Sequence, residues 1–346
     1  MRFAFSDEQD MLRASMRALL ARDCSAPAVR AAWSHESGRI PELWEKLAAL
    51  GIVGCTAPEA HGGLGMGAVE IVVLCEEAGR AALPEPLLET TAVAIPLLCD
   101  VADPETCSRW LPSIAAGRAV VSVRLGEAPY ASYAHVADLL LLQRDDELHG
   151  LTRDMVSLEP QRSVDGARRP FRVSWAPERT TCIGRGPAAR QAIMDALDRG
   201  SLAASAELLG LGQRMLDMTV LHTKMREQFG KPIGSFQAVK HHLADALGAL
   251  EIARPVVYRA AWSVATRSPE RAVHVSMAKA FASDAAGLVA RKALQCHGAI
   301  GYSFEHDLHL WMKRAWSLEA AWGDAASHRA RVSAALFGAR SSEAAQ

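Results

Sequence analysis

Residues Arg226 to His242 read R-E-Q-F-G-K-P-I-G-S-F-Q-A-V-K-H-H, and this stretch decides how the rest of the chain is organised. Helical patterns run up to it and away from it, but Gly230, Pro232 and Gly234 interrupt any continuous helix. The stretch therefore predicts a tight corner between two long helices. It brings together a guanidinium, two phenyl rings and a carboxamide, which are groups that can hold a nucleotide. The alternative is a plain helical hairpin with a solvated arginine and buried phenyl rings.

The composition excludes several classes of protein. Half of the 346 residues are apolar, and 38 Lys and Arg balance 39 Asp and Glu, so no net field favours nucleic acid or an anionic membrane. No apolar run has the length of a membrane span, and the N-terminus lacks the order of a signal peptide. The seven cysteines include no C-x-x-C pair that would suggest zinc or a redox motif. We expect a cytoplasmic protein with reduced, mostly buried cysteines.

The N-terminal third reads as helical. Ser6 followed by Gln9 predicts a capping box at the start of a first helix. Further helices are expected at 41–50 and 68–79. The glycine-rich stretch at 57–67 lacks the Gly-Lys-Ser/Thr ending of a phosphate loop, so it predicts a turn. We place an N-terminal helical domain at 1–117.

The pattern changes after this domain and then becomes helical again. Short apolar runs without helical spacing predict strands at 119–123, 136–142, 155–158 and 171–175, in a small β domain at 118–186. Helical patterns follow at 192–197, 202–226, 237–266, 269–295 and 308–337, and they predict a helical bundle over 187–340. A polar tail at 341–346 is expected to be disordered. The fold class is α+β.

Three stretches of the chain resemble the acyl-CoA dehydrogenase family of flavoproteins. The corner at Arg226 is similar to the family's helical-hairpin signature, and two further stretches agree with it in order and separation: Ala57 to Gly65 with Glu76 to Arg80, and Gln295 to Tyr302, Q-C-H-G-A-I-G-Y. Family members oxidise the Cα–Cβ bond of an acyl-CoA thioester with a carboxylate base and FAD. The resemblance covers nearly the whole chain. It implies the family fold, FAD as cofactor, and an electron acceptor such as electron-transfer flavoprotein as a partner.

The resemblance also implies that FAD is shared across a subunit interface. In the family, one subunit's middle domain holds the flavin ring while the neighbour's bundle holds the adenosine diphosphate portion. By this resemblance Arg226 pairs with the pyrophosphate, Phe229 packs on the cofactor, and Phe236 with Gln237 meets the adenosine end. In the second segment Gln295, Gly298 and Ala299 approach phosphate, although Ala299 stands where the family has glycine. The alternative for this segment is a simple glycine helix stop.

The elements that contact the flavin ring and the substrate are missing from the sequence. The predicted middle domain is truncated and lacks the family's Thr-Glu/Gly-Ser loop and Trp-Ile-Thr segment. The two family positions for the catalytic base fall on Trp322 and on Gly200, and neither residue accepts a proton. Glu207, Glu319 and Asp324 remain as candidates for a displaced base. Each competes with a structural role, because a carboxylate on a bundle helix commonly pairs with arginine or faces solvent.

Clusters of histidine and tryptophan mark the C-terminal part of the chain. His297, His306 and His309 surround the glycine turn, and their spacing predicts packing or phosphate contacts rather than a metal site. Trp311, Trp316 and Trp322 are five and six residues apart, which is a poor fit to one helix face. We expect some of these indoles to face a partner subunit.

Three functional hypotheses follow. In the first, the chain is a subunit that has lost its own active site and pairs with a homologous dehydrogenase subunit in a heterotetramer. It then completes the partner's FAD site, and the substrate is an acyl-CoA, including bulky steroid side-chain thioesters as in some actinobacterial enzymes. In the second, it is a self-sufficient homo-oligomeric dehydrogenase with Glu207 or Asp324 as the base. In the third, it is a non-enzymatic helical scaffold without flavin.

Overall fold

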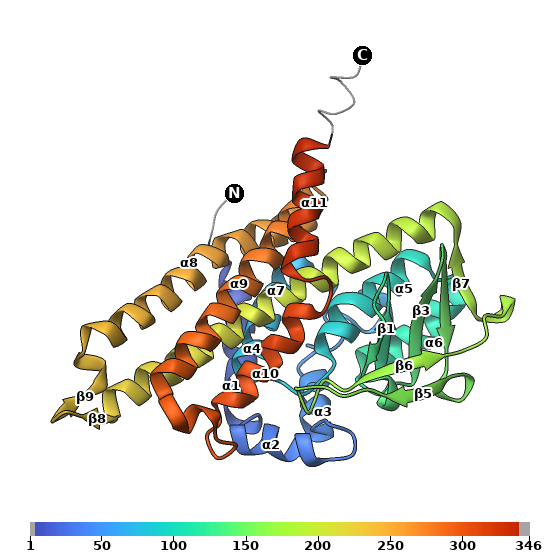
Figure 1. The fold of residues 1–346 in the computed structure, drawn as a ribbon. Coiled ribbons are helices and arrows are strands. Elements are labelled where there is room, and N and C mark those ends of the chain that lie inside the picture. The colour runs from blue at the N-terminus through green and yellow to red at the C-terminus, as the bar shows by residue number, and fades with distance from the viewer. Residues whose placement is uncertain (1–3, 339–346) are drawn as a thin grey trace.

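The computed structural model describes residues 4–338, so the predicted disordered tail at 341–346 lies outside it. Figure 1 shows long helices on one side of the molecule and most of the strands on the other, while two short strands lie at the far end of the long helices. Among the described residues, no helix combines the length and the apolar character needed to cross a membrane. The α+β architecture is confirmed, with helical regions before and after a small β region.

The N-terminal region is helical, and the predicted start of its first helix is confirmed. The Ser6 hydroxyl accepts a hydrogen bond from the Gln9 N–H, and the Gln9 side chain accepts one from the Ser6 N–H. A π-helical stretch, η2, was not predicted. The elements are α1 (Asp7–Asp23), α2 (Ala26–Ser34), α3 (Pro41–Ala49), η1 (Glu59–His61), α4 (Ala68–Ala81), η2 (Leu88–Ala94), α5 (Ile95–Val101) and α6 (Pro104–Ala115).

Two small sheets form the β region. One has the order β1-β3-β4-β7, with β1 parallel to β3 and the other neighbours antiparallel, and the second has the order β2-β6-β5. Of the apolar run predicted as a strand at 136–142, residues 139–142 form the buried first part of β3, while Val136 ends a 3₁₀ turn, η3 (Ala134–Val136). The strands are β1 (Val121–Arg124), β2 (Ala131–Ser132), β3 (Leu139–Arg144), β4 (Glu147–Leu151), β5 (Ser157–Pro160), β6 (Pro170–Ser174) and β7 (Cys182–Arg185).

The C-terminal region contains the predicted corner. Two short antiparallel strands and a 3₁₀ turn join the two longest helices, and Phe229 and Gly230 both have positive φ there. The elements are α7 (Gly186–Met225), β8 (Glu227–Gln228), β9 (Lys231–Pro232), η6 (Ile233–Ser235), α8 (Gln237–Ala265), α9 (Arg271–His297), η7 (Gly298–Tyr302), α10 (Leu308–Ala320) and α11 (Ala325–Phe337).

Two helix predictions were wrong in their boundaries. The patterns at 192–197 and 202–226 belong to one continuous helix, α7, which runs through Gly200. The pattern at 308–337 is broken, because Trp322 and Gly323 adopt left-handed φ values of 59° and 88°. Asp324 then caps α11 by accepting a hydrogen bond from the Ser327 N–H.

The helices α4 and α7 touch through glycines. A Cβ on Gly79 would lie 2.1 Å from the Glu207 carbonyl oxygen, and one on Gly210 would lie 1.9 Å from that of Glu76. Only glycine permits this approach. The close contact explains why glycine follows Glu76 and Glu77 in the stretch that resembles the family.

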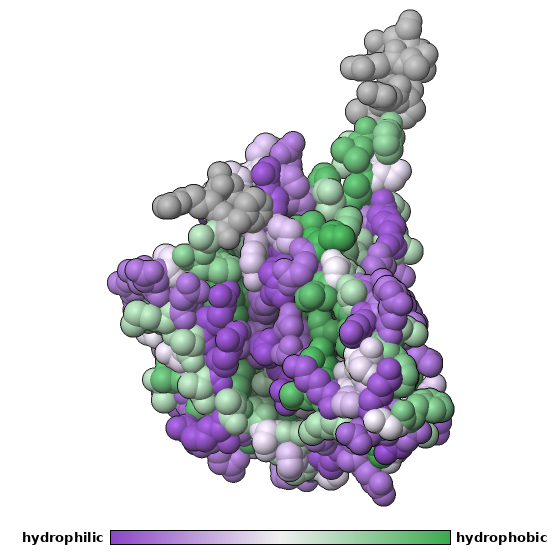
Figure 2. All heavy atoms as spheres, turned by 90° about the vertical axis from the view of Figure 1, so that its left-hand side faces the viewer, coloured by the Kyte–Doolittle hydropathy of each residue, from purple (hydrophilic) through white to green (hydrophobic). Residues whose placement is uncertain are grey.

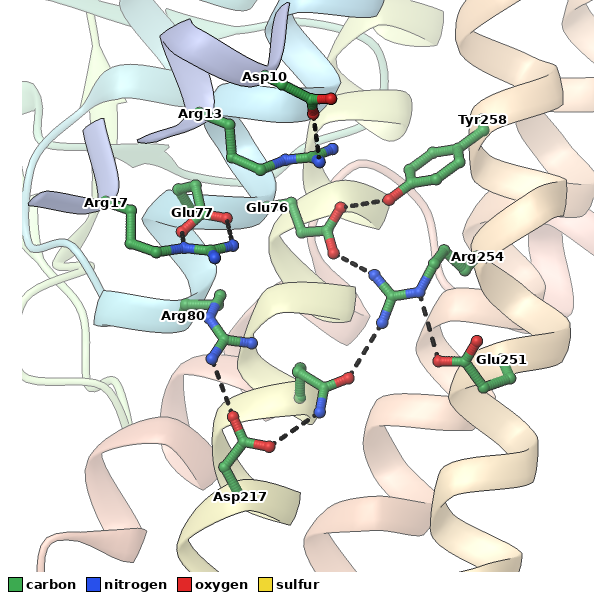
Figure 3. Close-up of polar contacts among 11 residues, drawn as sticks. Asp10, Arg13, Arg17, Glu76, Glu77, Arg80, Asp217, Glu251, Arg254 and Tyr258 are labelled. Carbon is green, nitrogen blue, oxygen red and sulfur yellow. Dashed lines mark hydrogen bonds and ion pairs between the residues drawn. The ribbon is translucent and has the colours of Figure 1, made fainter. Parts of the chain in front are cut away.

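A polar network beside this contact ties four helices together (Figure 3). The Glu76 carboxylate on α4 accepts hydrogen bonds from Arg254 and, at 2.8 Å, from the Tyr258 hydroxyl, both on α8. The neighbouring Glu77 accepts two bonds from Arg17 on α1. These carboxylates are buried and paired, so their role is structural.

Candidate functional site

The corner presents unpaired groups to solvent. Arg226 ends α7, where its N–H donates to the His222 carbonyl, and its guanidinium forms no ion pair or hydrogen bond with another described residue. The Phe229 side chain is 92% exposed and meets the Phe236 ring edge to face at 6.0 Å. Lys231 Nζ lies 4.5 Å from the centre of the Phe236 ring. The alternative of buried phenyl rings is therefore wrong for Phe229.

The glycine segment lies beside this corner. Gly298 ends α9 with φ of 64°, and no atom lies within 4 Å of the position that a Cβ would take. Gln295 and Ala299 on either side are exposed, and so is Gln237 at the start of α8. The His222 ring on α7 stacks on the His297 ring at 4.3 Å, which holds the end of α7 against the end of α9.

These groups fit the phosphate and adenosine portion of a dinucleotide. An exposed guanidinium can hold a diphosphate, and an open glycine lets phosphate approach the backbone. The Phe229 ring meets the edge of the Phe236 ring but is almost fully exposed, so most of its surface is available to a ligand or another subunit. The residues suit the part of FAD distant from the flavin ring.

Gly200 and Trp322, the residues at the two positions where the resemblance places the base, contact each other in the structure. A Cβ on Gly200 would lie 2.3 Å from Cε3 and 2.5 Å from Cδ2 of the Trp322 indole. The Trp322 carbonyl accepts hydrogen bonds from Ser201 Oγ at 3.0 Å and from His328 Nε2 at 2.9 Å. The indole therefore fills the space over Gly200, and neither position offers a carboxylate.

A buried lysine holds the same turn from the other side. Lys279 on α9 is fully buried, and its Nζ donates to the carbonyl oxygens of Glu319 at 3.0 Å and Gly323 at 2.8 Å. Burial lowers the pKa of Lys279 to about 8. The lysine fixes the connection between α10 and α11, and with it the position of Trp322.

Two of the three candidate bases, Asp324 and Glu319, lie on either side of the Trp322 turn in different surroundings. Asp324 is exposed and caps α11, and the N–H of Ser327 at 2.8 Å lowers its pKa. That is the opposite of what a general base near neutral pH needs. The Glu319 pKa is raised, mainly by burial. Its Oε1 is buried without a hydrogen-bond partner among the described residues and lies 3.0 Å from the position that a Cβ on Gly287 of α9 would take.

The third candidate, Glu207, belongs to a buried cluster of charges that the sequence did not reveal. Arg168 Nη1 lies 2.8 Å from Glu89 Oε1, and Arg314 pairs with Asp165. Burial raises the pKa of Glu207 to about 7, while Arg314 and Arg168 oppose the shift. At pH values below this pKa Glu207 is protonated, and the two guanidiniums face the carboxylates of Glu89 and Asp165. The cluster joins η2, the β region, α7 and α10, so no local spacing could have predicted it.

The histidine and tryptophan predictions are corrected in part. His297 and His306 do lie together, 4.7 Å apart between ring centres, but His309 instead contacts Trp33 and Phe304. The missed member is His222, one helical turn before Arg226, and that spacing was the available signal.

The three tryptophans have different surroundings. Trp311 is buried and donates to the Arg80 carbonyl at 2.9 Å, whereas Trp316 is 40% exposed. Trp322 packs on Gly200 as described. Of the three indoles, Trp316 is the one with an outward face for a partner.

Comparison with known proteins identifies the class. Residues 6–118 match the acyl-CoA dehydrogenase N-terminal domain, and residues 190–337 match the acyl-CoA dehydrogenase C-terminal domain. The chain belongs to the acyl-CoA dehydrogenase family, whose members are flavoprotein oxidoreductases. FAD is therefore the cofactor that the family indicates.

Individual relatives cover most of the chain. Acyl-CoA dehydrogenase IpdE2 from Mycolicibacterium smegmatis is 34% identical over 96% of this chain and 100% of the relative. IpdE2 from Mycobacterium tuberculosis is 33% identical over 89% of this chain and 91% of the relative. A chain of the ChsE4–ChsE5 complex from Mycobacterium tuberculosis is 25% identical, with a TM-score of 0.87 over 97% of this chain and 99% of that one.

Proposed function

We propose that this chain is a subunit of an FAD-dependent acyl-CoA dehydrogenase that lacks its own catalytic base and completes the FAD site of a homologous partner. The observation that carries the proposal is the contact between Trp322 and Gly200. α-Proton abstraction needs a carboxylate over the substrate, and an indole cannot accept the proton. Ser201 and His328 donate to the Trp322 carbonyl and Lys279 donates to the Gly323 carbonyl, so the turn that carries the indole is fixed.

The exposed corner supports the second half of the proposal. FAD, when bound, supplies the acceptor for the hydride that leaves the β-carbon. In our proposal Arg226 and Gln295 hold its diphosphate, Gly298 and Ala299 approach it through the backbone, and Phe229, Phe236 and Gln237 cover the adenosine end. The carboxylate that removes the α-proton comes from the partner. The truncated β region, in which only residues 125–130 separate β1 from β2, supports the loss of the ring-binding half.

An apolar outer surface supports an assembled state. Figure 2 faces the side of the molecule on which α8 lies and shows apolar residues in a strip between hydrophilic bands. Exposed apolar side chains come from both α8 and α9: Leu247, Ile252, Trp262, Met277 and Phe281. A patch of this kind is typical of an interface. We propose that the homologous subunit covers it.

The substrate and setting follow from the family resemblance. We infer that the complex desaturates an acyl-CoA, with bulky steroid side-chain thioesters as the favoured class, and passes electrons to an acceptor such as electron-transfer flavoprotein. All seven cysteines are free, which supports a reducing compartment such as the cytoplasm.

One experiment separates the three hypotheses. The chain is purified alone and also co-expressed with the homologous dehydrogenase encoded beside it, and flavin absorbance is recorded before and after anaerobic addition of an acyl-CoA. We expect colour and bleaching in the mixture only. Bleaching by the isolated chain would favour a self-sufficient enzyme, and a colourless protein in both preparations would favour a scaffold.

A matched variant sharpens this test. Asp324→Asn and Glu207→Gln in this chain remove the two bases that the hypothesis of a self-sufficient enzyme names. Bleaching by the complex should continue in both variants, because the proposal assigns proton abstraction to the partner. Loss of bleaching in either folded variant would assign the base to this chain instead.

A further inference from the structure

Three imidazoles from separate segments converge beneath the glycine turn. His222 lies in the last turn of α7, His297 is the last residue of α9, and His306 follows η7. One nitrogen from each ring lies within 4.8 Å of the other two. The ring centres are 4.3 Å apart for His222 and His297, and 4.7 Å apart for His297 and His306.

The central imidazole has an unused lone pair. His297 is only 6% exposed, and its Nδ1 lies 2.8 Å from the Ala293 carbonyl oxygen, to which it donates. That bond places the proton on Nδ1, so Nε2 is an acceptor, and it is buried without a hydrogen-bond partner among the described residues. Metal-binding histidines commonly donate the other ring N–H to a carbonyl in this manner.

The charge state of the cluster suits a cation. Burial lowers the pKa of His297 to about 4, and burial together with His306 and Arg226 lowers that of His222. Both rings are therefore neutral near pH 7, and the neutral imidazole is the form that binds a metal.

A second group of possible ligands in the described part of the chain shows the contrast. Glu147, His149 and Cys182 also lie together, but both nitrogens of His149 already face partners. Nδ1 lies 2.9 Å from Thr181 Oγ1, and Nε2 lies 3.3 Å from Glu147 Oε2. That group satisfies its own hydrogen bonds, whereas His297 does not.

We propose that His222, His297 and His306 bind a divalent transition metal of the Zn²⁺ type and leave a further coordination position open. Three imidazoles are a common ligand set for such ions. Bonds of roughly 2.0–2.1 Å to a tetrahedral ion need the nitrogens to lie about 3.3–3.4 Å apart, which is inside the 4.8 Å limit that holds for this group. The half-exposed rings of His222 and His306 can approach the buried His297 by rotating, and His306 would then give up the hydrogen bond that its Nδ1 accepts from the Leu308 N–H at 3.2 Å. The ion would fasten the ends of α7 and α9 together, and this inference does not depend on the proposed function.

Cobalt provides a direct probe. The full chain, without a histidine tag and freed of metal with a chelator, is titrated with Co²⁺ while the visible d–d absorption is recorded, and Zn²⁺ is then added. We expect saturation at one Co²⁺ per chain and loss of the bands when Zn²⁺ displaces it. Zn²⁺ should also raise the unfolding temperature.

Single substitutions assign the ligands. His222→Asn and His306→Asn should each weaken Co²⁺ binding at least tenfold, whereas His241→Asn, at an exposed histidine on α8, should bind as the unaltered chain does. The two ligand variants alter half-exposed side chains, so the test does not rely on replacing the buried His297. Absence of saturable d–d bands in the unaltered chain, or equal binding by all three variants, would overturn the proposal.

Discussion

The contact between Trp322 and Gly200 makes Gly200→Ala an informative substitution. The new methyl group would lie 2.3, 2.5 and 2.6 Å from three atoms of the indole, whereas ordinary carbon contacts are about 3.5–4.0 Å. The ring would have to move by about 1 Å, but the Trp322 carbonyl is held by Ser201 and His328. Overpacking of this kind costs about 1–3 kcal/mol, and it opposes a gain of about 1 kcal/mol from replacing glycine in a helix.

Gly248→Ala is the matched control, because Gly248 also lies inside a helix but has no atom within 4 Å of the added methyl group. Urea denaturation followed by circular dichroism should show that Gly248→Ala stabilises the protein by about 1 kcal/mol. Gly200→Ala should be about 1–3 kcal/mol less stable than this control.

A double-mutant cycle tests the cause of the difference. In a Trp322→Ala background the methyl group meets no ring, so Gly200→Ala should become about as favourable as Gly248→Ala. Equal effects of the two alanine substitutions in the unaltered chain would refute the claim that the indole fills the base position.

Three further predictions concern separate parts of the molecule. The Glu207 pKa in the folded chain, about 7, exceeds the free value of 4.5, so its burial lowers stability as pH rises from about 4.5 to 7. Glu207→Gln should therefore stabilise the protein by on the order of 1–3 kcal/mol above pH 7 and have little effect below about pH 4, measured by denaturation across pH. Arg254→Ala removes the guanidinium that pairs with the buried Glu76 and should lower the free energy of unfolding by about 3 kcal/mol in the same assay. Arg13→Ala, which removes the partner of the exposed Asp10, should lower it by less than about 1 kcal/mol. Phe229→Ala should change the free energy of unfolding by less than about 0.5 kcal/mol but lower the flavin content of the complex. Phe337→Ala, at another exposed ring, should leave both the stability and the flavin content unchanged.

Local signals explain what could be predicted from the sequence. The Ser6 capping box, the strand at β3 and the corner at Gly230 and Pro232 each depend on residues within one short segment. For such features, hydrophobic period, caps and backbone restrictions are sufficient. Resemblance to the family then placed Arg226 and Gly298 in one site, and the stacking of His222 on His297 supplies the physical link between their helices.

Long-range packing explains what could not be predicted. The helix pattern at 308–337 gave no sign of a break, because the left-handed turn at Trp322 and Gly323 is held by Lys279 from another helix. In the same way, Glu207 shares its buried cluster with side chains from the N-terminal and β regions. Neither contact leaves a spacing in the sequence, since the partners are far apart in the chain.

The central claim is that one half of an FAD site survives in this chain while the other half and the base are lost. Its most direct test is the flavin stoichiometry of the purified complex with the homologous subunit, from flavin absorbance and the protein concentration of each chain. The account predicts one FAD for every pair of unlike chains, because only the partner holds the flavin ring. One FAD for every chain, or full occupancy in this chain alone, would contradict it.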